Sequence, residues 1–294
     1  PSTHQIAEMV AYEKGWWADD LKPFGITKIE EIQFPTGVPE MQAMVAGELD
    51  VAYVGTAPPI SAIAAGLPAK IVAAVNINGS DLVLRPGLNY SGPASLSGLS
   101  IGTYQPGSIQ DTVMKKWLMN SGVDINSVDI KGMDPGPAMT ALFAGELDGV
   151  FLPHPFPSIV ELKGNGIEAV SSGQMWPGHA CCSLVVSEKL IKGHPELVDQ
   201  IVKTRIKATE YIKAHPEEAA QIYAKKTKSN LTEIEHSIES WDGKWVSDPS
   251  IQIPSTVEYA RVDYEMNYTR RELTAEDLFD TSFYERVKGA EQSD

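Results

Sequence analysis

Apolar positions recur with two different periods along the chain. Residues 5–14 and 39–49 carry apolar side chains at helical spacing, whereas residues 26–34 alternate between apolar and polar side chains as a strand does. Short apolar runs at residues 50–55 and 69–75 predict buried strands. Helices and short strands therefore alternate, which predicts an α/β protein built on sheets.

One stretch of this pattern occurs twice. The sequence "MVAGELDVAYVGTAPP" (residues 44–59) returns as "LFAGELDGVFLPHPFP" (residues 142–157), at an offset of 98 residues. Each copy predicts a helix, a glycine that closes it in a left-handed conformation, an acidic turn and a strand. A repeat at the spacing of a whole domain predicts two similar lobes rather than a solenoid.

The acidic residues of the repeat and the residues after its strands have different predicted roles. Glu48, Asp50, Glu146 and Asp148 fit a solvated helix-to-strand turn better than a catalytic pair. Ligands of open α/β sheets bind beyond the carboxyl ends of the strands. The residues that follow the two strands, Thr56 and His154, are therefore expected to face a shared cleft.

A third strand-to-helix junction lies at "YQPGSIQD", residues 104–111. Ser108 is the expected N-cap of a helix that ends near Gly122, and the first backbone N–H groups of this helix would point toward the predicted cleft. Such a terminus favours an anion or an electron-rich polar group. An ordinary capped helix explains the same residues equally well.

The C-terminal third is helical and charged. Helices are predicted to start at "HPELV" and "HPEEA", where proline suits the first turn and where His194 and His215 have a local structural role. Further helices are predicted at residues 231–241, 253–268 and 273–287.

Composition narrows the function classes. The 294 residues suffice for one large or two medium domains, and the formal net charge of -15 argues against nucleic acid as a partner. No stretch reaches the roughly 18 apolar residues of a membrane-spanning helix, and the first residues do not resemble a signal peptide, so an exported parent would have lost its leader. Four Asn-x-Ser/Thr sequons favour an extracytoplasmic protein, although surface turns share this composition; they begin at Asn78, Asn89, Asn230 and Asn267.

The segment "MWPGHACCSLVVS" concentrates aromatic, imidazole and thiol side chains before a predicted strand. Trp176, in an irregular turn, is a candidate pocket wall. Thiols and imidazoles can ligate a soft or borderline metal, and the candidate set is His4, His154, His179 and Cys181. Two buried apolar thiols, Cys181 and Cys182, are the simpler explanation.

Sequence motifs of common enzymes are missing. The chain contains no phosphate loop, Rossmann glycine pattern, nucleophile elbow or zincin helix. The sequence therefore predicts a binding protein without a cofactor rather than an enzyme.

Across almost its whole length the sequence resembles the solute-binding proteins of ABC importers, in the group that includes nitrate, taurine, sulfonate and thiamine-pyrimidine-precursor binders. The matching segments are "AYEKGWWADDL", "MVAGELDVAYVGTAPP", "GLPAKIVAAV", "LSGLSIGTYQPGS", "FAGELDGVFL" and "HPELV". The resemblance implies a periplasmic-binding-protein-like fold of type II: two α/β lobes, two crossover hinge strands near residues 81–87 and 182–187, and a helical C-terminal segment. It implies lobe 1 from residues 1–83 plus 184–294, and lobe 2 from residues 84–183.

The same resemblance implies the contact residues of the solute. These are His4, Gln5, Thr56, Ala57, Asn76, Asn78, Ser108, Ile109, Gln110, His154, Trp176, His179 and Cys181. The chain departs from the group in two ways: it begins after the group's first strand, and the predicted cleft loops carry no arginine of the kind that sulfonate binders use. Arg85 is the nearest arginine, and a protonated His154 or His179 could replace it. The segment "HACC" is similar to, but shorter than, the cysteine-rich loop of the pyrimidine-precursor binders.

The resemblance therefore implies an extracytoplasmic receptor that captures a small polar or anionic solute and delivers it to a permease and its ATPase. We expect a monomer that touches the membrane only through an anchor in the parent protein. A receptor for a metal ion or metal complex is the alternative. A pyrimidine-precursor binder or synthase-like enzyme is the third reading, and it requires turnover.

Overall fold

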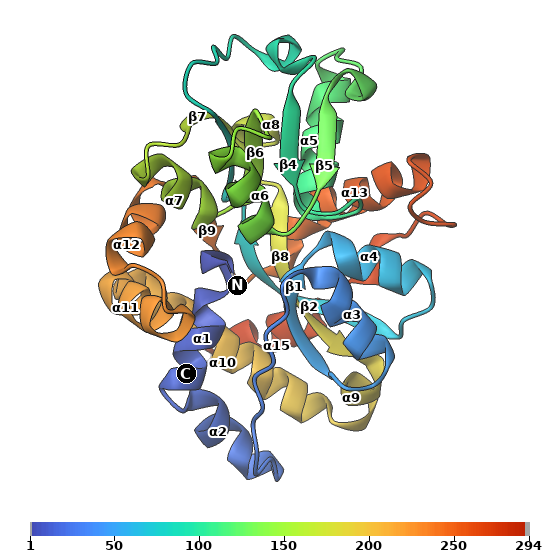
Figure 1. Cartoon of the computed structure of the whole chain (residues 1–294). Coiled ribbons are helices and arrows are strands. Elements are labelled where there is room, and N and C mark those ends of the chain that lie inside the picture. Colours follow the sequence, from blue (N-terminus) through green and yellow to red (C-terminus); the bar gives the residue numbers. More distant parts are fainter. Residues whose placement is uncertain (1, 292–294) are drawn as a thin grey trace.

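The computed structural model describes residues 2–291 and contains two β-sheets surrounded by helices (Figure 1). The strands are β1 (Val51–Gly55), β2 (Ala69–Ile77), β3 (Ser80–Leu84), β4 (Ser100–Thr103), β5 (Asp129–Gly132), β6 (Gly149–Pro153), β7 (Ile167–Ser171), β8 (Ala180–Ser187) and β9 (Lys244–Trp245). The helices of the first two-thirds are α1 (Ile6–Glu13), α2 (Trp16–Leu21), α3 (Gly37–Val45), α4 (Ala57–Ala64), α5 (Ile109–Asn120), α6 (Pro135–Phe143), α7 (Phe156–Leu162) and α8 (Ser172–Met175). The C-terminal third contributes α9 (Glu188–Gly193), α10 (Pro195–Ala214), α11 (Pro216–Thr227), α12 (Leu231–Ser240), α13 (Ile253–Glu265), α14 (Ala275–Leu278) and α15 (Ser282–Glu291). Short 3-10 helices are η1 (Thr3–Gln5), η2 (Lys22–Phe24), η3 (Pro93–Leu96), η4 (Ile125–Ser127) and η5 (Pro249–Gln252).

The first sheet has the strand order β1-β8-β2-β9. Strand β8 runs antiparallel to both of its neighbours, with Val51 opposite Val186 and Gly55 opposite Cys182 on one side. All eight residues of β8 are buried. Because a strand that is buried on both faces cannot alternate between polar and apolar residues, β8 has the continuous apolar run that the sequence shows.

The second sheet has the strand order β5-β4-β6-β3-β7. Strand β4 is parallel to β5 and β6, whereas β3 is antiparallel to β6 and β7. Helices α5, α6 and α7 pack around this sheet, which is the upper part of Figure 1. The two sheets and their helices confirm the predicted two-lobed α/β fold.

The chain passes between the sheets twice. It leaves the first sheet at Ile77 and enters the second at Ser80, and it returns between Ser171 and Ala180 through α8. Both passages lie before the predicted crossover strands, because residues 81–84 are an inner strand of the second sheet and residues 182–187 an inner strand of the first. The exact division of the chain into lobes stays a prediction.

The predicted repeat is present with the predicted offset. Helix α3 and strand β1 correspond to α6 and β6, residue for residue, at a distance of 98 positions. Gly47 and Gly145 close the two helices with φ of 77° and 75°. These left-handed values confirm the predicted helix ends.

The prediction of a strand at residues 26–34 is wrong. This segment is irregular, and a strand needs a neighbour to satisfy its backbone groups. A cavity separates this segment from the edge strand β1. Residues 26 and 28–34 line the cavity on one side, and residues 49–53 line it on the other. Among residues 2–291 this segment pairs with no strand, and its apolar side chains are not fully buried, since Ile32 is 52% exposed.

Helices of the C-terminal third join the two lobes outside the sheets. The ammonium of Lys115 on α5 donates to the Tyr268 hydroxyl at 2.8 Å, and that hydroxyl donates to Asp111 Oδ2 at 3.2 Å. Lys116, also on α5, pairs with Glu258 on α13. On the other side, α12 packs on α7 (Figure 1). The predicted helix starts at Pro195 and Pro216 are confirmed.

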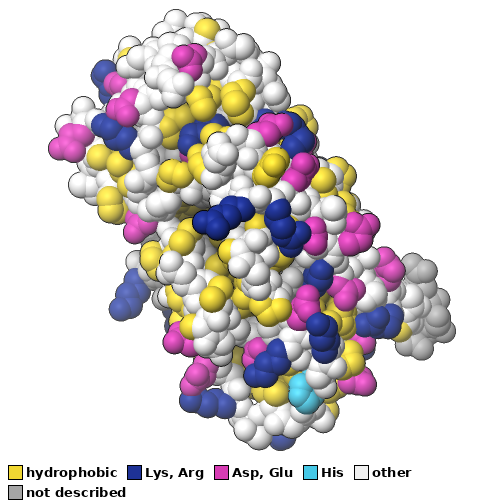
Figure 2. Space-filling model, turned by 90° about the vertical axis from the view of Figure 1, so that its right-hand side faces the viewer, with side chains coloured by type: hydrophobic (Ala, Val, Ile, Leu, Met, Phe, Trp, Pro, Cys, Tyr) yellow, Lys and Arg dark blue, Asp and Glu magenta, His cyan; other side chains and the backbone are white. Residues whose placement is uncertain are grey.

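The surface carries charges of both signs. On the face that Figure 2 shows, Lys and Arg side chains are interspersed with Asp and Glu side chains. Among the described residues, no helix combines the length and the apolar character needed to cross a membrane.

Candidate functional site

A cavity of about 650 Å³ lies at the junction of the lobes. The first lobe contributes residues of η1, α1, α3, β1 and β8, together with the irregular segment 26–36. The second lobe contributes uncharged residues: Tyr104, Gln105, Ser108, Ile109, Gln110 and Pro153. The volume is in the usual range for small-molecule sites, roughly 300–1,000 Å³.

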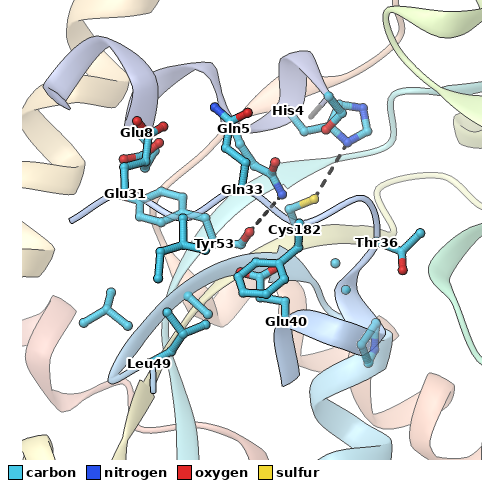
Figure 3. A pocket seen from close by; sticks show the side chains of 18 of the residues that line it. His4, Gln5, Glu8, Glu31, Gln33, Thr36, Glu40, Leu49, Tyr53 and Cys182 are labelled. Atoms are coloured by element: carbon cyan, nitrogen blue, oxygen red, sulfur yellow. Dashed lines mark hydrogen bonds between the residues drawn. The ribbon is translucent and has the colours of Figure 1, made fainter. Parts of the chain in front are cut away.

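One end of the cavity is formed by an imidazole and two thiols, those of His4, Cys181 and Cys182. Figure 3 labels His4 and Cys182. His4 Nδ1 lies 3.3 Å from Cys181 Sγ and 3.8 Å from Cys182 Sγ. His4 Nε2 lies 2.7 Å from the Gly79 carbonyl oxygen, which can only accept, so Nε2 carries the proton and Nδ1 accepts from the thiols. All three side chains are buried, and both thiols are free.

The second lobe presents the start of α5 to the cavity. Ser108 caps this helix by accepting from the Asp111 backbone N–H at 3.2 Å, as predicted. The Gln110 side chain donates to Ser80 Oγ at 3.1 Å and lines the cavity. The first N–H groups of a helix have no intrahelical acceptor, so this end can receive a polar or anionic group of a solute.

The opposite end of the cavity is acidic. Glu8 of α1 and Glu31 point toward one another, and Glu40 of α3 lies across the cavity from them (Figure 3). Burial, with the charge of Glu31, raises the pKa of Glu8 to about 8. Burial, with the charge of Glu8, raises the pKa of Glu40 to about 8. The lining carboxylates Glu8, Glu30, Glu31, Glu40, Glu48 and Asp50 outnumber the lining cation Lys28.

Six of the predicted contact residues line this cavity: His4, Gln5, Ser108, Ile109, Gln110 and Cys181. Three more lie directly behind the lining. Thr56 donates from its backbone N–H (2.8 Å) and its hydroxyl (3.1 Å) to the Cys181 carbonyl, and Asn76 Oδ1 accepts from the Cys182 N–H at 3.0 Å. Ala57 is the buried first residue of α4.

The remaining predicted residues lie outside the cavity lining. Asn78, with φ of 53°, accepts from the Gly178 N–H at the lobe connection. Trp176 borders a separate surface hollow of about 530 Å³, where the Lys116 ammonium lies 5.0 Å from its ring centroid. His179 Nδ1 lies 2.8 Å from the Tyr259 hydroxyl oxygen, and burial lowers the pKa of His179 to about 4.

His154 is the centre of a buried polar cluster rather than a cavity residue. Its Nε2 lies 2.5 Å from Asp81 Oδ2 and its Nδ1 lies 3.0 Å from Ser237 Oγ. This arrangement has the composition of a Ser-His-Asp triad, but all three side chains are buried and none lines the cavity, so the serine has no access to a substrate. The cluster instead ties α12 of the first lobe to the second lobe.

The four candidate metal ligands are consequently not one group. His4 and Cys181 lie together, and the third member of their cluster is Cys182. His154 and His179 bind other partners. Arg85, the arginine considered for the pocket, pairs with Asp148 at 2.9 Å outside the cavity lining.

Several cavity residues were missed by sequence reasoning. They are Glu8, Gln33, Thr36, Glu40, Tyr53, Tyr104, Gln105 and Cys182. Tyr104 and Gln105 lie in the turn just before the predicted cap Ser108, so their position was a usable signal. Glu40 had no such signal, since its counterpart in the repeat is the buried Ala138.

Comparison with known proteins places the chain in a family. The profile of the NMT1-like family matches residues 1–226. A relative from Bacillus subtilis (strain 168), named a putative aliphatic sulfonates-binding protein, is 23% identical over 283 residues, which cover 95% of this chain and 84% of that protein.

Two solved structures show the same fold. The alkanesulfonate-binding protein SsuA from Xanthomonas axonopodis pv. citri, bound to MOPS, has a TM-score of 0.81 at 18% identity. The match covers 95% of this chain and 96% of the SsuA chain. The periplasmic nitrate-binding protein NrtA from Synechocystis PCC 6803 has a TM-score of 0.84 at 16% identity and covers 98% of this chain and 86% of its own. With its two lobes and the cavity at their junction, this chain belongs to the NMT1-like family and has the fold of the periplasmic binding proteins.

Proposed function

We propose that this protein is an extracytoplasmic solute-binding receptor of an ABC importer. It captures a small polar solute between its lobes and delivers it to a permease and its ATPase, acting as a monomer. The relative from Bacillus subtilis and the two solved structures named above are binding proteins by name, and they support this proposal. In this proposal the receptor binds its solute without chemical turnover, and the triad-like cluster around His154 is not part of the cavity lining.

The observation that carries the proposal is that one cavity is lined by both lobes. Gln5 and Gly55 come from the first lobe, and Ser108 and Gln110 come from the second. A solute that contacts all of them binds the closed arrangement better than an open one, and this difference drives closure. The two short passages between the sheets permit such a motion.

The charges of the lining favour a solute with an acidic group and an amino group. The acidic group fits the first turn of α5, where the lining residues of the second lobe are uncharged. The amino group fits the acidic end, because a nearby ammonium stabilises the carboxylate forms of Glu8 and Glu40. Among sulfonate, nitrate and taurine, the aminosulfonate taurine combines both groups.

Isothermal titration with taurine, ethanesulfonate and nitrate tests this function. We expect taurine to bind most tightly, and we expect Gln110→Ala to weaken its binding by about tenfold, which corresponds to about 1.4 kcal/mol. Gln221→Ala, an exposed glutamine on α11, is the matched control and leaves affinity unchanged. Recovery of unaltered taurine by mass spectrometry shows binding without turnover.

Two results would contradict the proposal. One is the absence of heat with all three solutes together with the absence of any copurified organic mass in native mass spectrometry. The other is equal weakening by Gln110→Ala and Gln221→Ala, which would place the solute outside this cavity.

A further inference from the structure

Three potential metal-ligand atoms lie together at the wall of the cavity. They are His4 Nδ1, Cys181 Sγ and Cys182 Sγ, and all three lie within 4.8 Å of one another. In a tetrahedral zinc site with Zn–N of about 2.05 Å and Zn–S of about 2.3 Å, a nitrogen and a sulfur ligand are about 3.6 Å apart. The observed separations of His4 Nδ1 from the two sulfurs, 3.3 and 3.8 Å, bracket that value.

A bulge in β8 explains how two consecutive cysteines reach one imidazole. In a regular strand, neighbouring side chains point to opposite faces. Here Asn76 is paired with Cys182 and Ile77 with Ala180, so Cys181 is the extra residue of a bulge. Bulges commonly re-aim side chains next to functional sites.

The surroundings hold all three groups in an orientation suited to a metal. The Gly79 carbonyl fixes the proton of His4 on Nε2, which leaves the Nδ1 lone pair directed at the sulfurs. Thr56 holds the carbonyl of Cys181, and Asn76 holds the N–H of Cys182. Gln252 Nε2 donates to the Cys182 carbonyl at 2.9 Å. Each ligand therefore has its own fixed support.

We infer that His4, Cys181 and Cys182 form a binding site for a thiol-preferring metal ion, Zn²⁺ in the first instance, with a fourth coordination position that opens into the cavity. The three residues are 1%, 1% and 5% exposed, and all three line the cavity. Two thiolates and one imidazole suit zinc, and binding releases the two thiol protons to solvent. A polar group of a solute, or water, completes the coordination.

Cobalt is the probe for the experiment because Co²⁺ bound to thiolates absorbs in the near ultraviolet. The full chain is reduced, treated with chelator, freed of both reagents under argon and titrated with Co²⁺ without any solute. We expect a thiolate-to-cobalt charge-transfer band that saturates at about one equivalent and is abolished by added Zn²⁺. We expect Cys181→Ser and Cys182→Ser each to weaken Zn²⁺ binding by at least about 100-fold, since even outer-shell changes cost roughly 10- to 100-fold.

His194→Gln, a change at an exposed histidine that lies at the start of α10, is the matched control and keeps the band. Absence of the band in the reduced wild-type protein overturns the inference. A band that persists unchanged in both serine variants also overturns it, because the metal is then bound elsewhere. Taurine binding by the chelator-treated protein is measured separately, so failure of the metal site and failure of the solute-receptor proposal are distinguishable.

Discussion

The two copies of the repeat are alike up to the ends of their strands and differ beyond them. In both, a left-handed glycine ends the helix and an aspartate fixes the turn: Asp50 accepts from Ser187 Oγ at 2.7 Å, and Asp148 accepts from the Ser100 N–H at 2.9 Å. After the first strand, Thr56 supports the wall of the cavity, whereas after the second strand, His154 is sealed in a polar cluster. The shared residues therefore build the fold, and the residues that differ determine which loop serves the site.

The largest loss of stability is expected in the second copy, where the residue after the strand is buried in a polar cluster. His154→Ala leaves Asp81 and Ser237 buried without their partner and should lower the free energy of unfolding by about 3–5 kcal/mol. Thr56→Ala, at the equivalent position of the first copy, removes one hydroxyl and should cost about 1–3 kcal/mol. Urea unfolding measures both. A stable His154→Ala protein with weakened taurine binding would reverse the assignment of the two loops.

The helices of the two copies differ in their response to pH. Glu40 of α3 has its pKa raised from 4.5 to about 8, while Ala138 takes its place in α6. Because the folded state holds the Glu40 proton more tightly than the unfolded state, this group stabilises the fold fully below about pH 4.5, and its contribution is lost as the pH rises toward 8.

Glu40→Gln removes this dependence. Between pH 5 and 7.5, the stability of the variant relative to wild type should rise by about 1 kcal/mol per pH unit. Urea unfolding at several pH values measures it, with Glu146→Gln, at an exposed glutamate of the second copy, as the control that keeps the wild-type slope. Parallel curves for wild type and Glu40→Gln would show that Glu40 is not buried in its protonated form.

The smallest change in stability is expected in the turn that the two copies share, where a left-handed glycine ends the helix. Gly47→Ala and Gly145→Ala should each lower the free energy of unfolding by about 1–2 kcal/mol, because an L-residue is strained at these positive φ values while a Cβ meets no atom within 4 Å at either position. Gly136→Ala, at an open helical position without positive φ, should instead be neutral or stabilising. Unequal costs at Gly47 and Gly145, measured by thermal unfolding, would show that the shared turns are not equivalent.

The sequence predicted the fold better than the site. The repeated words located the repeat, and cap and first-turn residues located the α5 cap and the helix starts at Pro195 and Pro216, because each signal depends on residues near in sequence. Residues 26–34 have the pattern of a strand, but the pattern does not reveal whether a pairing partner lies beside them.

The residues of the site were harder to predict, because contacts between segments that are distant in sequence determine which side chains reach the cavity. Cys182 was left out of the predicted contact set although Cys181 was included, and the bulge that brings both sulfurs to one imidazole cannot be read from "HACC". His154 was expected at the cleft because it ends a strand. Asp81, which pairs with it, comes from a strand 73 positions earlier.

Gly79 carries a consequence for the mechanics of the whole molecule. Its carbonyl receives both the His4 ring N–H and the His154 backbone N–H, and it occupies the two-residue link between β2 and β3. A Cβ at this position would lie 2.7 Å from the Trp241 ring and 2.8 Å from His4 Nε2, so glycine is required. Any torsion of this link that swings one lobe also turns the carbonyl that steers the imidazole. The angle between the lobes and the orientation of the ring are thus coupled. A ligand that binds the ring shifts the equilibrium of the lobe angle, and the lobe angle changes the affinity for that ligand by the same free energy.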